Sequence, residues 1–275
     1  MQPSYLPCQH VEMPAVTQST LQERVPQHPA VQFIRQYHLA KLPSKFASAP
    51  MSETPSLQSL PLFPLGSVLF PGGLLPLRIF EVRYLDMIGK CHRHGAPFGV
   101  VSLIEGSEVR KPATAAEETP GAPSGDGFAV EVFNVVGTLA LITECSAPHP
   151  GLMMVRCTGQ QRFTITRREK LKHGLWVADV AYLPDDQTIT IPDDLKPAAD
   201  ALGGVIKALQ GRAMPADEMP MLPPYQLEDC AWVANRWCEL LPMPPDVKQR
   251  LMALDNPLVR LELVSDMLAR AGIVK

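Results

Sequence analysis

Residues 60–87 read LPLFPLGSVLFPGGLLPLRIFEVRYLDM and predict an apolar strand, a turn, a second apolar strand and the start of a helix. Pro61 and Pro64 lack a backbone donor, so the first strand is expected at a sheet edge or with a bend. Pro71 and Gly72 suit the centre of a type II turn, because proline presets φ and glycine accepts a positive φ. Helical spacing then predicts one buried helix face, formed by Phe80, Tyr84, Met87 and Ile88.

The region after residue 97 has the composition of short β-strands. Runs rich in β-branched and aromatic residues alternate with glycines, a spacing that predicts a closed or nearly closed small barrel. Residues 107–127 contain alanines, acids and prolines, and are expected to form a mobile surface loop. The expected strands span residues 98–104, 128–136, 138–143, 152–157, 162–166 and 175–183.

Helix signals replace strand signals after about residue 186. Asp193 or Asp194 is expected to cap a helix that runs through Gln210. Apolar spacing predicts an amphipathic helix over 227–241, a short helix near 247–254, and a last helix that Asn256 caps. The predicted fold class is therefore α+β: a β-rich, barrel-like (pseudo-barrel) lobe over 58–186 and a small helical bundle over 187–275, as two lobes of one module.

Residues 1–57 are rich in Pro, Gln, Ser and His, and are expected to be a disordered or non-native extension. Residues 31–46 contain three basic residues and no acid, which is compatible with an amphipathic targeting helix. Alternatively, Met51 is the natural start, and the residues before it come from an overextended reading frame. The second interpretation is favoured, since the extension has no packing pattern.

Several segments resemble the amino-terminal, substrate-binding domain of Lon (La) ATP-dependent proteases, in order and over roughly residues 58–270. They are LPLFPL (60–65), LFPG (69–72), LPLRIFE (75–81) with Arg83-Tyr84, FGVV (98–101), VGTLA (136–140) with Ile142, Gly159 with Arg162-Phe163, LLP (240–242), Lys248-Gln249, Leu251 and Arg260-Leu261. The resemblance implies a module that binds unfolded or extended polypeptides.

A complete Lon protease would add ATPase and peptidase modules. The chain has no G-x-x-x-x-G-K-[ST] loop, and Gly203-Gly204 is followed by Val205-Ile206 in a helical pattern. We therefore expect a standalone binding protein that is not an enzyme and needs no cofactor, with a protease or chaperone as a further partner.

The composition is that of an ordinary globular protein. A formal net charge of −3 provides no global attraction to nucleic acid or to anionic lipid, so nucleic acid is disfavoured and no membrane partner is expected. Six cysteines without a C-x-x-C pair favour a reducing cytoplasm over a disulfide scaffold. No apolar run approaches the ~20 residues that span a bilayer.

Other chemistry has weaker signals. Cys91-His92-Arg93-His94 offers three metal-binding side chains, but adjacent helical positions point apart and no second cluster follows. We expect no metal site there. A serine elbow of the form G-x-S-x-G is absent from the sequence, although folding can assemble a catalytic triad from distant residues.

A charged cluster marks the junction between the second strand and its helix. Arg78 and Glu81 are predicted to form a structural ion pair. In the functional interpretation the same junction is one wall of a peptide groove, with substrate-binding residues Phe80, Arg83, Tyr84, Arg162 and Phe163.

Three functions remain open from the sequence. The favoured one is a non-catalytic polypeptide-binding module, acting as an adaptor in protein quality control. The alternatives are a peptidase or other hydrolase that uses a cleft between the lobes, and a small-molecule or RNA-binding barrel, since small β-barrels carry many functions.

Overall fold

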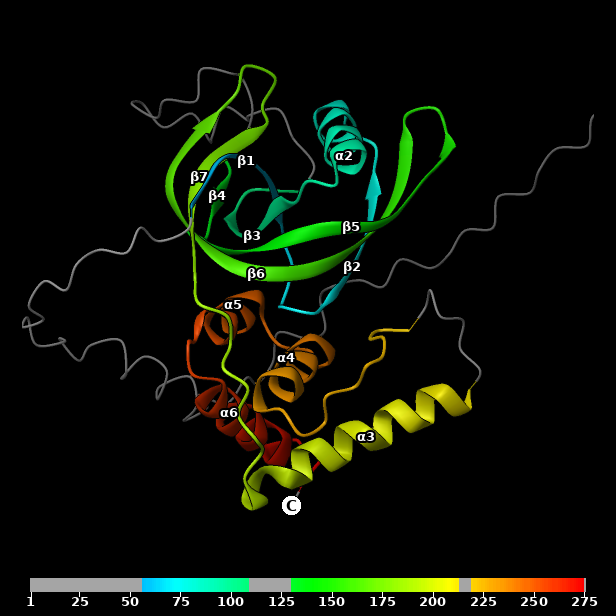
Figure 1. The fold of residues 1–275 in the computed structure, drawn as a ribbon, viewed down its shortest axis with the longest axis vertical. Coiled ribbons are helices and arrows are strands. Elements are labelled where there is room, and N and C mark those ends of the chain that lie inside the picture. Colours follow the sequence, from blue (N-terminus) through cyan, green and yellow to red (C-terminus); the bar gives the residue numbers. More distant parts are fainter. Residues whose placement is uncertain (1–55, 109–129, 213–218, 275) are drawn as a thin grey trace, which may run out of the picture. The chain divides into compact units, whose positions relative to one another are not determined.

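The structure is a computed structural model that describes residues 56–108, 130–212 and 219–274 (Figure 1). The extension before residue 56 and most of the expected loop at 107–127 lie outside the described residues. The strands are β1 (Ser56–Leu65), β2 (Leu74–Ile79), β3 (Phe98–Glu105), β4 (Val132–Phe133), β5 (Val136–His149), β6 (Leu152–Lys170) and β7 (Trp176–Tyr182). The helices are α2 (Val82–His94), a 3-10 turn (Asp193–Leu195), α3 (Lys196–Gly211), α4 (Cys230–Leu240), α5 (Pro245–Ala253) and α6 (Pro257–Arg270).

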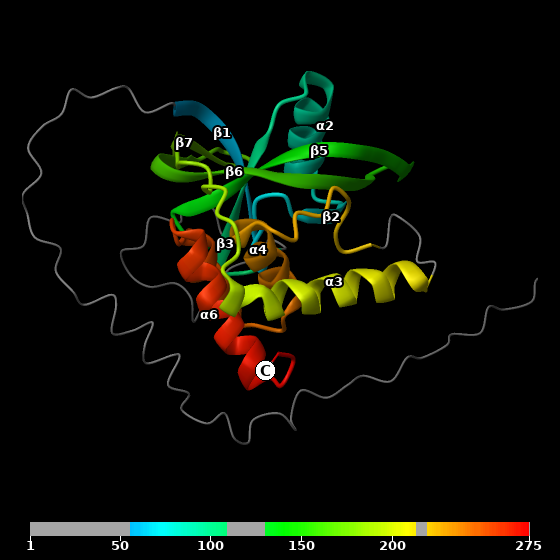
Figure 2. The ribbon, with the colours of Figure 1, turned by 60° about the horizontal axis from the view of Figure 1, so that its bottom comes forward.

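Five strands close into a barrel, as the strand spacing predicted. They pair in the order β1-β7-β6-β5-β3, and a parallel pairing of β1 with β3 completes the ring. β2 pairs with β6 beside β7, and β4 pairs with β3. In the views of Figures 1 and 2, α2 and α3–α6 lie on opposite sides of the sheet. We call β1–β7 with α2 the barrel lobe, and α3–α6 the helical lobe.

β1 is not the edge strand that its prolines suggested. It pairs with β7 up to Leu62 and with β3 from Leu62 onward, so it has partners on both sides. Pro61 lies opposite Val177 of β7, and Pro64 lies opposite Val101 of β3. At each proline, β1 therefore pairs with only one neighbouring strand. The N–H that proline lacks is then not needed for a hydrogen bond to a second neighbour.

Four other strand predictions were wrong in their boundaries. In the described part of the run 128–136, β4 covers only Val132–Phe133. β5 extends from Val136 to His149 instead of covering 138–143, and the runs 152–157 and 162–166 are one continuous strand, β6. Gly159 was expected to punctuate these runs, but it lies within β6. A β-carbon there would overlap the carbonyl oxygen of Phe70, so glycine serves a close backbone approach rather than a turn.

The helices of the helical lobe follow the predicted apolar pattern, but the residues that cap them differ in part from the predicted ones. Asn256 caps α6 through the amides of Leu258 and Val259, as predicted. Asp229 caps α4 in the same way and so precedes the helix, rather than lying in its first turn. No side chain caps α3.

Two buried arginines connect the lobes through one carboxylate. Arg162 of β6 donates to the main-chain oxygens of Met252 and Leu254, both at 3.0 Å, and lies 3.3 Å from Asp186. Arg260 of α6 is fully buried and pairs with Asp186 at 2.6 Å. Asp186 therefore compensates two cations that have little access to water.

Asp186→Ala should lower the free energy of unfolding by about 3–5 kcal/mol, because both guanidinium groups would lose their shared carboxylate. Urea denaturation measures this loss. The neighbouring Asp185 is exposed, so Asp185→Ala should change stability by no more than about 0.5 kcal/mol. Equal losses in the two variants would contradict the network.

Gly159→Ala should destabilise the fold by about 2–3 kcal/mol, because its methyl group would overlap the Phe70 carbonyl. Gly204, in the middle of α3, has open space where a β-carbon would lie. Gly204→Ala should therefore stabilise by about 0.5–1 kcal/mol through helix propensity. Thermal melts would test the opposite signs, and a neutral Gly159→Ala would contradict the close approach.

Candidate functional site

The turn between β1 and β2 has the predicted type II features. Gly72 has φ 72°, and Gly73 donates its amide to the carbonyl of Phe70 at 3.0 Å. The turn also pairs with β6: Gly72 donates to Gly159, and Gly159 donates to Gly73, each at 2.8 Å. The close approach at Gly159 therefore fixes the turn against the barrel.

Arg236 of α4 holds the other side of the same turn. Its guanidinium donates to the carbonyl of Pro71 at 2.8 Å and also to the carbonyl of Gly72. The same group pairs with Glu239 at 3.1 Å. Arg236 is buried, and its contacts place the first residues of β2 against the end of α4.

The carboxylate of Glu239 lies against Gly73 of this turn. A β-carbon at Gly73 would overlap its Oε1 atom. Burial raises the pKa of Glu239 to about 7, and the positive charges of Arg236 and Lys248 only partly offset this.

A groove of about 350 Å³ opens beside Glu239, between the two lobes. The wall from the barrel lobe is largely apolar, and the end of α4 and the start of the 219–229 segment form the other wall. We call this the junction groove. Its lining residues are Ser67, Val68, Leu69, Leu74, Leu75, Pro76, Arg156, Met219, Pro220, Glu239, Leu240 and Lys248.

The junction groove runs along an unpaired strand edge. Within the described residues, β2 pairs with β6 alone. Successive side chains of a strand point to opposite faces, so a hollow lined by Leu74, Leu75 and Pro76 of β2 and by Arg156 of β6 covers part of one face of the sheet and extends to the edge of β2.

The register of β2 shows which main-chain groups face that edge. The carbonyl of Gly73 accepts from β6, and bonded positions alternate in an antiparallel pair. Leu75, Leu77 and Ile79 therefore bond to β6, whereas Leu74, Pro76 and Arg78 direct their main-chain groups outward. Proline is tolerated at this outward position because its missing donor faces no partner strand.

Most of the predicted substrate-binding residues are buried. Tyr84 stacks on Phe63 with ring centroids 4.0 Å apart, and Phe163 lies within the barrel core. Arg162 belongs to the network with Asp186 described above. Phe80 is 52% exposed, but it lies between β2 and α2 and does not contribute to the buried helix face.

The predicted pair of Arg78 with Glu81 is replaced by a different one. Glu81 pairs with Arg83 at 3.0 Å, and Arg78 is exposed on β2. Arg83 also lies 3.2 Å from Glu131, a buried carboxylate that accepts from the indole of Trp176. The ion pairs of Arg83 with Glu81 and Glu131 therefore fasten the start of α2 to the barrel, in place of the predicted pair of Arg78 with Glu81.

The sequence did not single out Glu239, or the charge of Lys248, as part of a site. Both side chains reach the groove only because α4 and α5 fold back against the turn. The signal available was indirect: Arg236 and Glu239 lie one helical turn apart in a segment, 230–240, whose other residues are apolar except Asn235.

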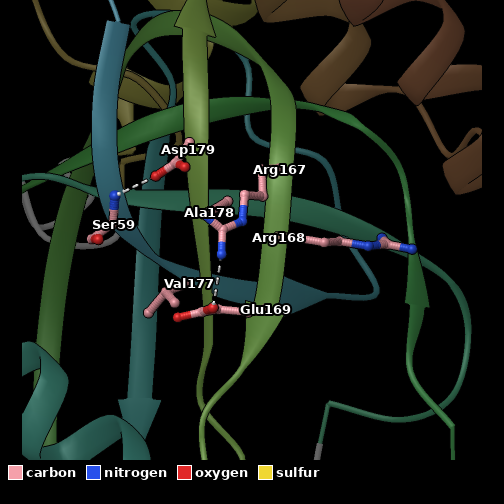
Figure 3. Close-up of a pocket in the computed structure, with 7 residues that line it drawn as sticks. All are labelled: Ser59, Arg167, Arg168, Glu169, Val177, Ala178 and Asp179. Atoms are coloured by element: carbon pink, nitrogen blue, oxygen red, sulfur yellow. Dashed lines mark hydrogen bonds and ion pairs between the residues drawn. The ribbon is translucent and has the colours of Figure 1, made fainter. Parts of the chain in front are cut away.

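A second, smaller hollow of about 50 Å³ lies on the outer face of β6, β7 and β1 (Figure 3). Its charged groups already have partners: Arg167 pairs with Glu169, and Asp179 accepts from the amide of Ser59. Arg168 points away from the hollow in Figure 3 and lies over the ring of Phe133. This hollow is therefore a poor candidate for a ligand site.

Reactive chemistry has little support among the described residues. Burial raises the pKa values of Cys157 and Cys238 to about 12, which keeps both thiols protonated. Within the described ranges, no three His, Cys, Asp or Glu side chains gather in an arrangement that could hold a metal. His92 and His94 are exposed at the end of α2.

Comparisons with known proteins agree with the fold. A sequence model of the ATP-dependent protease La (LON) substrate-binding domain matches residues 59–270. The chain belongs to this family. The predicted resemblance is thus confirmed, and with it the assignment as a substrate-binding module. A search of curated proteins gave no match.

The chain is also similar to solved structures of Lon N-terminal domains. The Lon N-terminal domain protein from Xanthomonas campestris is 29% identical, with a TM-score of 0.56, over 78% of this chain and 98% of that chain. The N-terminal domain of the Mycobacterium avium complex Lon protease is 16% identical, with a TM-score of 0.49, over 77% of this chain and 98% of that chain. The first likeness supports the barrel-plus-helices architecture.

None of the helices in the described part of the chain combines the length and the apolar character that crossing a bilayer requires.

The raised pKa of Glu239 predicts a pH dependence of stability. The folded protein holds this proton more tightly than the unfolded chain, whose carboxyl has a pKa near 4.5, so the contribution is complete below that pH and is lost as the pH rises through about 7. Between about pH 5.5 and pH 8, wild type should lose about 1–3 kcal/mol more stability than Glu239→Gln, which stays neutral. Urea denaturation at both pH values measures this.

Glu262→Gln, at an exposed position on α6, is the matched control and should follow wild type. Parallel pH profiles for wild type and Glu239→Gln would show that Glu239 does not hold its proton in the folded state.

Proposed function

We propose that this chain binds extended, partly apolar polypeptide segments in the junction groove and acts as an adaptor that presents them to a protease or chaperone. The observation that carries the proposal is the groove itself, which combines an apolar wall with the unpaired edge of β2. The membership of the Lon substrate-binding family supports a polypeptide as the ligand.

The proposed binding mode is addition of a strand to β2. The edge offers the carbonyl oxygens of Leu74, Pro76 and Arg78 and the amides of Leu74 and Arg78, with one donor lost at Pro76. Main-chain hydrogen bonds of this kind are independent of the side chains of the ligand, which suits a module that accepts many polypeptides. Side chains of the ligand would enter the apolar part of the groove and contribute most of the affinity.

Phe80 extends this surface beyond the groove. It follows β2 directly, about 13 Å from Pro76 at the rise of a strand, and its ring is half exposed. A segment that continues along β2 would reach Phe80 after four residues. Phe80 is the one residue of the site predicted from sequence that keeps a proposed role in contact with the ligand.

Leu74→Ser and Phe80→Ser should each weaken the binding of an unfolded polypeptide about 5–10-fold, the effect of losing a moderate apolar contact. Fluorescence anisotropy with a labelled, permanently unfolded polypeptide measures the affinity, and thermal melts verify that each variant is folded.

Ile104→Ser is the control, because Ile104 is also an exposed apolar residue but lies on β3, outside the groove. It should leave the affinity unchanged. The proposal fails if folded Leu74→Ser binds as tightly as wild type.

A further inference from the structure

β2 has one buried face and one exposed face. Leu77 and Ile79 belong to the barrel core, and they alternate with Pro76, Arg78 and Phe80, which are exposed. Phe80 directly follows the last residue of β2 and continues this alternation, as expected for an extended chain whose successive side chains point to opposite faces. We call the exposed side the outer face of β2.

The junction groove covers only the first part of this outer face. Its lining includes Leu74 and Pro76 of β2, together with Arg156, which lies opposite Pro76 on β6. Arg78 and Phe80 lie further along and do not line the groove. A polypeptide that fills the groove and continues along β2 therefore meets a second stretch of exposed surface.

That second stretch carries two apolar side chains from neighbouring strands. Met154 of β6 lies directly opposite Arg78, so it shares the outer face, and it is 44% exposed. Phe80 is 52% exposed and lies two residues beyond Arg78, which places it diagonally from Met154. Diagonal neighbours of this kind are within reach of aromatic and long side chains. We call Phe80 and Met154 the distal pair.

Charged side chains separate the groove from the distal pair. Arg78 lies between Pro76 and Phe80 on the outer face, and Arg156 is 3.8 Å from Glu144 on the adjacent strand β5. A ligand side chain opposite Arg78 gains little from being apolar, because it would cover a charged group. The outer face thus has two apolar places with a polar position between them.

We propose that the chain selects extended segments by a fixed spacing of apolar residues: two residues that are two positions apart enter the junction groove, and a third, large one lies four positions further on, against the distal pair. The inference rests on the proposed function and specifies its ligand. In a strand added to β2, the three residues opposite Leu74, Pro76 and Phe80 have this spacing. The strand rise places the third residue about 13 Å beyond the second.

The parity of this spacing is its specific consequence. Moving the third apolar residue by one position turns its side chain to the other face of the added strand, away from Phe80 and Met154. A shift of the whole segment does not correct this, because the two residues in the groove move by the same amount. Association through apolar area alone would depend on composition and not on parity.

The test uses two capped peptides of the same composition on a serine and threonine background. Both have leucines at positions 2 and 4, and a phenylalanine stands at position 8 in the even peptide and at position 7 in the odd peptide. Each is also made with its sequence reversed, because an added strand can run parallel or antiparallel to β2. Fluorescence anisotropy with the full chain should show about 5–10-fold tighter binding of the even peptide in at least one of the two directions.

Variants of the distal pair should remove this preference. Phe80→Ser should reduce it at least about threefold, and Met154→Ser about twofold, because β2 lies between Met154 and the added strand. Met154→Leu keeps an apolar side chain of similar volume and should retain the preference. Ile104→Ser, an exposed position on β3 outside the groove, is the control and should match wild type. Thermal melts verify that each variant is folded.

The outcomes separate this inference from the proposed function. Equal binding of the even and odd peptides in both directions, or tighter binding of the odd one, would overturn the spacing rule. The groove would be retained if Leu74→Ser still weakened both. A preference that survives both Phe80→Ser and Met154→Ser would also overturn the rule. Binding that is indifferent to Leu74→Ser, or no binding of any peptide, would overturn the proposed function as well.

Discussion

The guanidinium of Arg236 donates to the carbonyls of the turn between β1 and β2. The position of that turn determines where β2 begins and where the junction groove lies. The opposite side of the turn is bonded to Gly159 of β6, so the turn lies between the barrel and α4. β2 starts there, and its direction along β6 follows from where the turn is held. The bonds to Gly159 hold the start of β2, which is one wall of the groove. The bonds of Arg236 hold the end of α4, which is the other wall.

Arg236 and Arg162 connect the lobes through main-chain carbonyls, whereas Arg260 bonds to carbonyls of its own lobe and reaches Asp186. Arg236, Arg162 and Arg260 all donate to carbonyls of turns or helix ends, and each also has a carboxylate partner. Carbonyls at turns and helix ends receive no hydrogen bond from a helix or a sheet ladder. A guanidinium therefore supplies the donors that these buried carbonyls would otherwise lack. The planar guanidinium of arginine presents several donors in fixed directions, whereas the donors of lysine share one nitrogen on a flexible stem. These hydrogen bonds hold the helical lobe in a fixed position against the barrel, although the segments that connect the two lobes have no regular secondary structure.

The sequence predicted those features that depend on local chemistry. Pro71 and Gly72 specify their turn by their own φ preferences, and Asn256 with Pro257 starts α6 because both residues suit a helix start. The barrel was predicted from the spacing of strands, yet the closing pair of β1 with β3 joins residues about 40 apart and has no local signal. Gly159 illustrates the limit, since a glycine that ends a strand and one that admits a neighbouring carbonyl look identical in sequence.

The candidate site was predicted less well for the same reason. Arg83 and Tyr84 follow β2 closely in the sequence, but Glu131, 48 residues away, turns Arg83 inward, and Phe63 covers Tyr84. Periodicity identified the buried face of α2 and could not identify the partner of each polar residue on it. Lys248 was noted only within the family resemblance, because its proximity to β2 depends on how three helices pack.

In the binding mode proposed above, the short edge of β2 also sets how selective this module can be. A strand of six residues with proline in its third position offers few main-chain bonds, so a bound segment can shift its register by two residues at little cost. Main-chain pairing alone would then accept almost any extended chain, and discrimination must come from side chains.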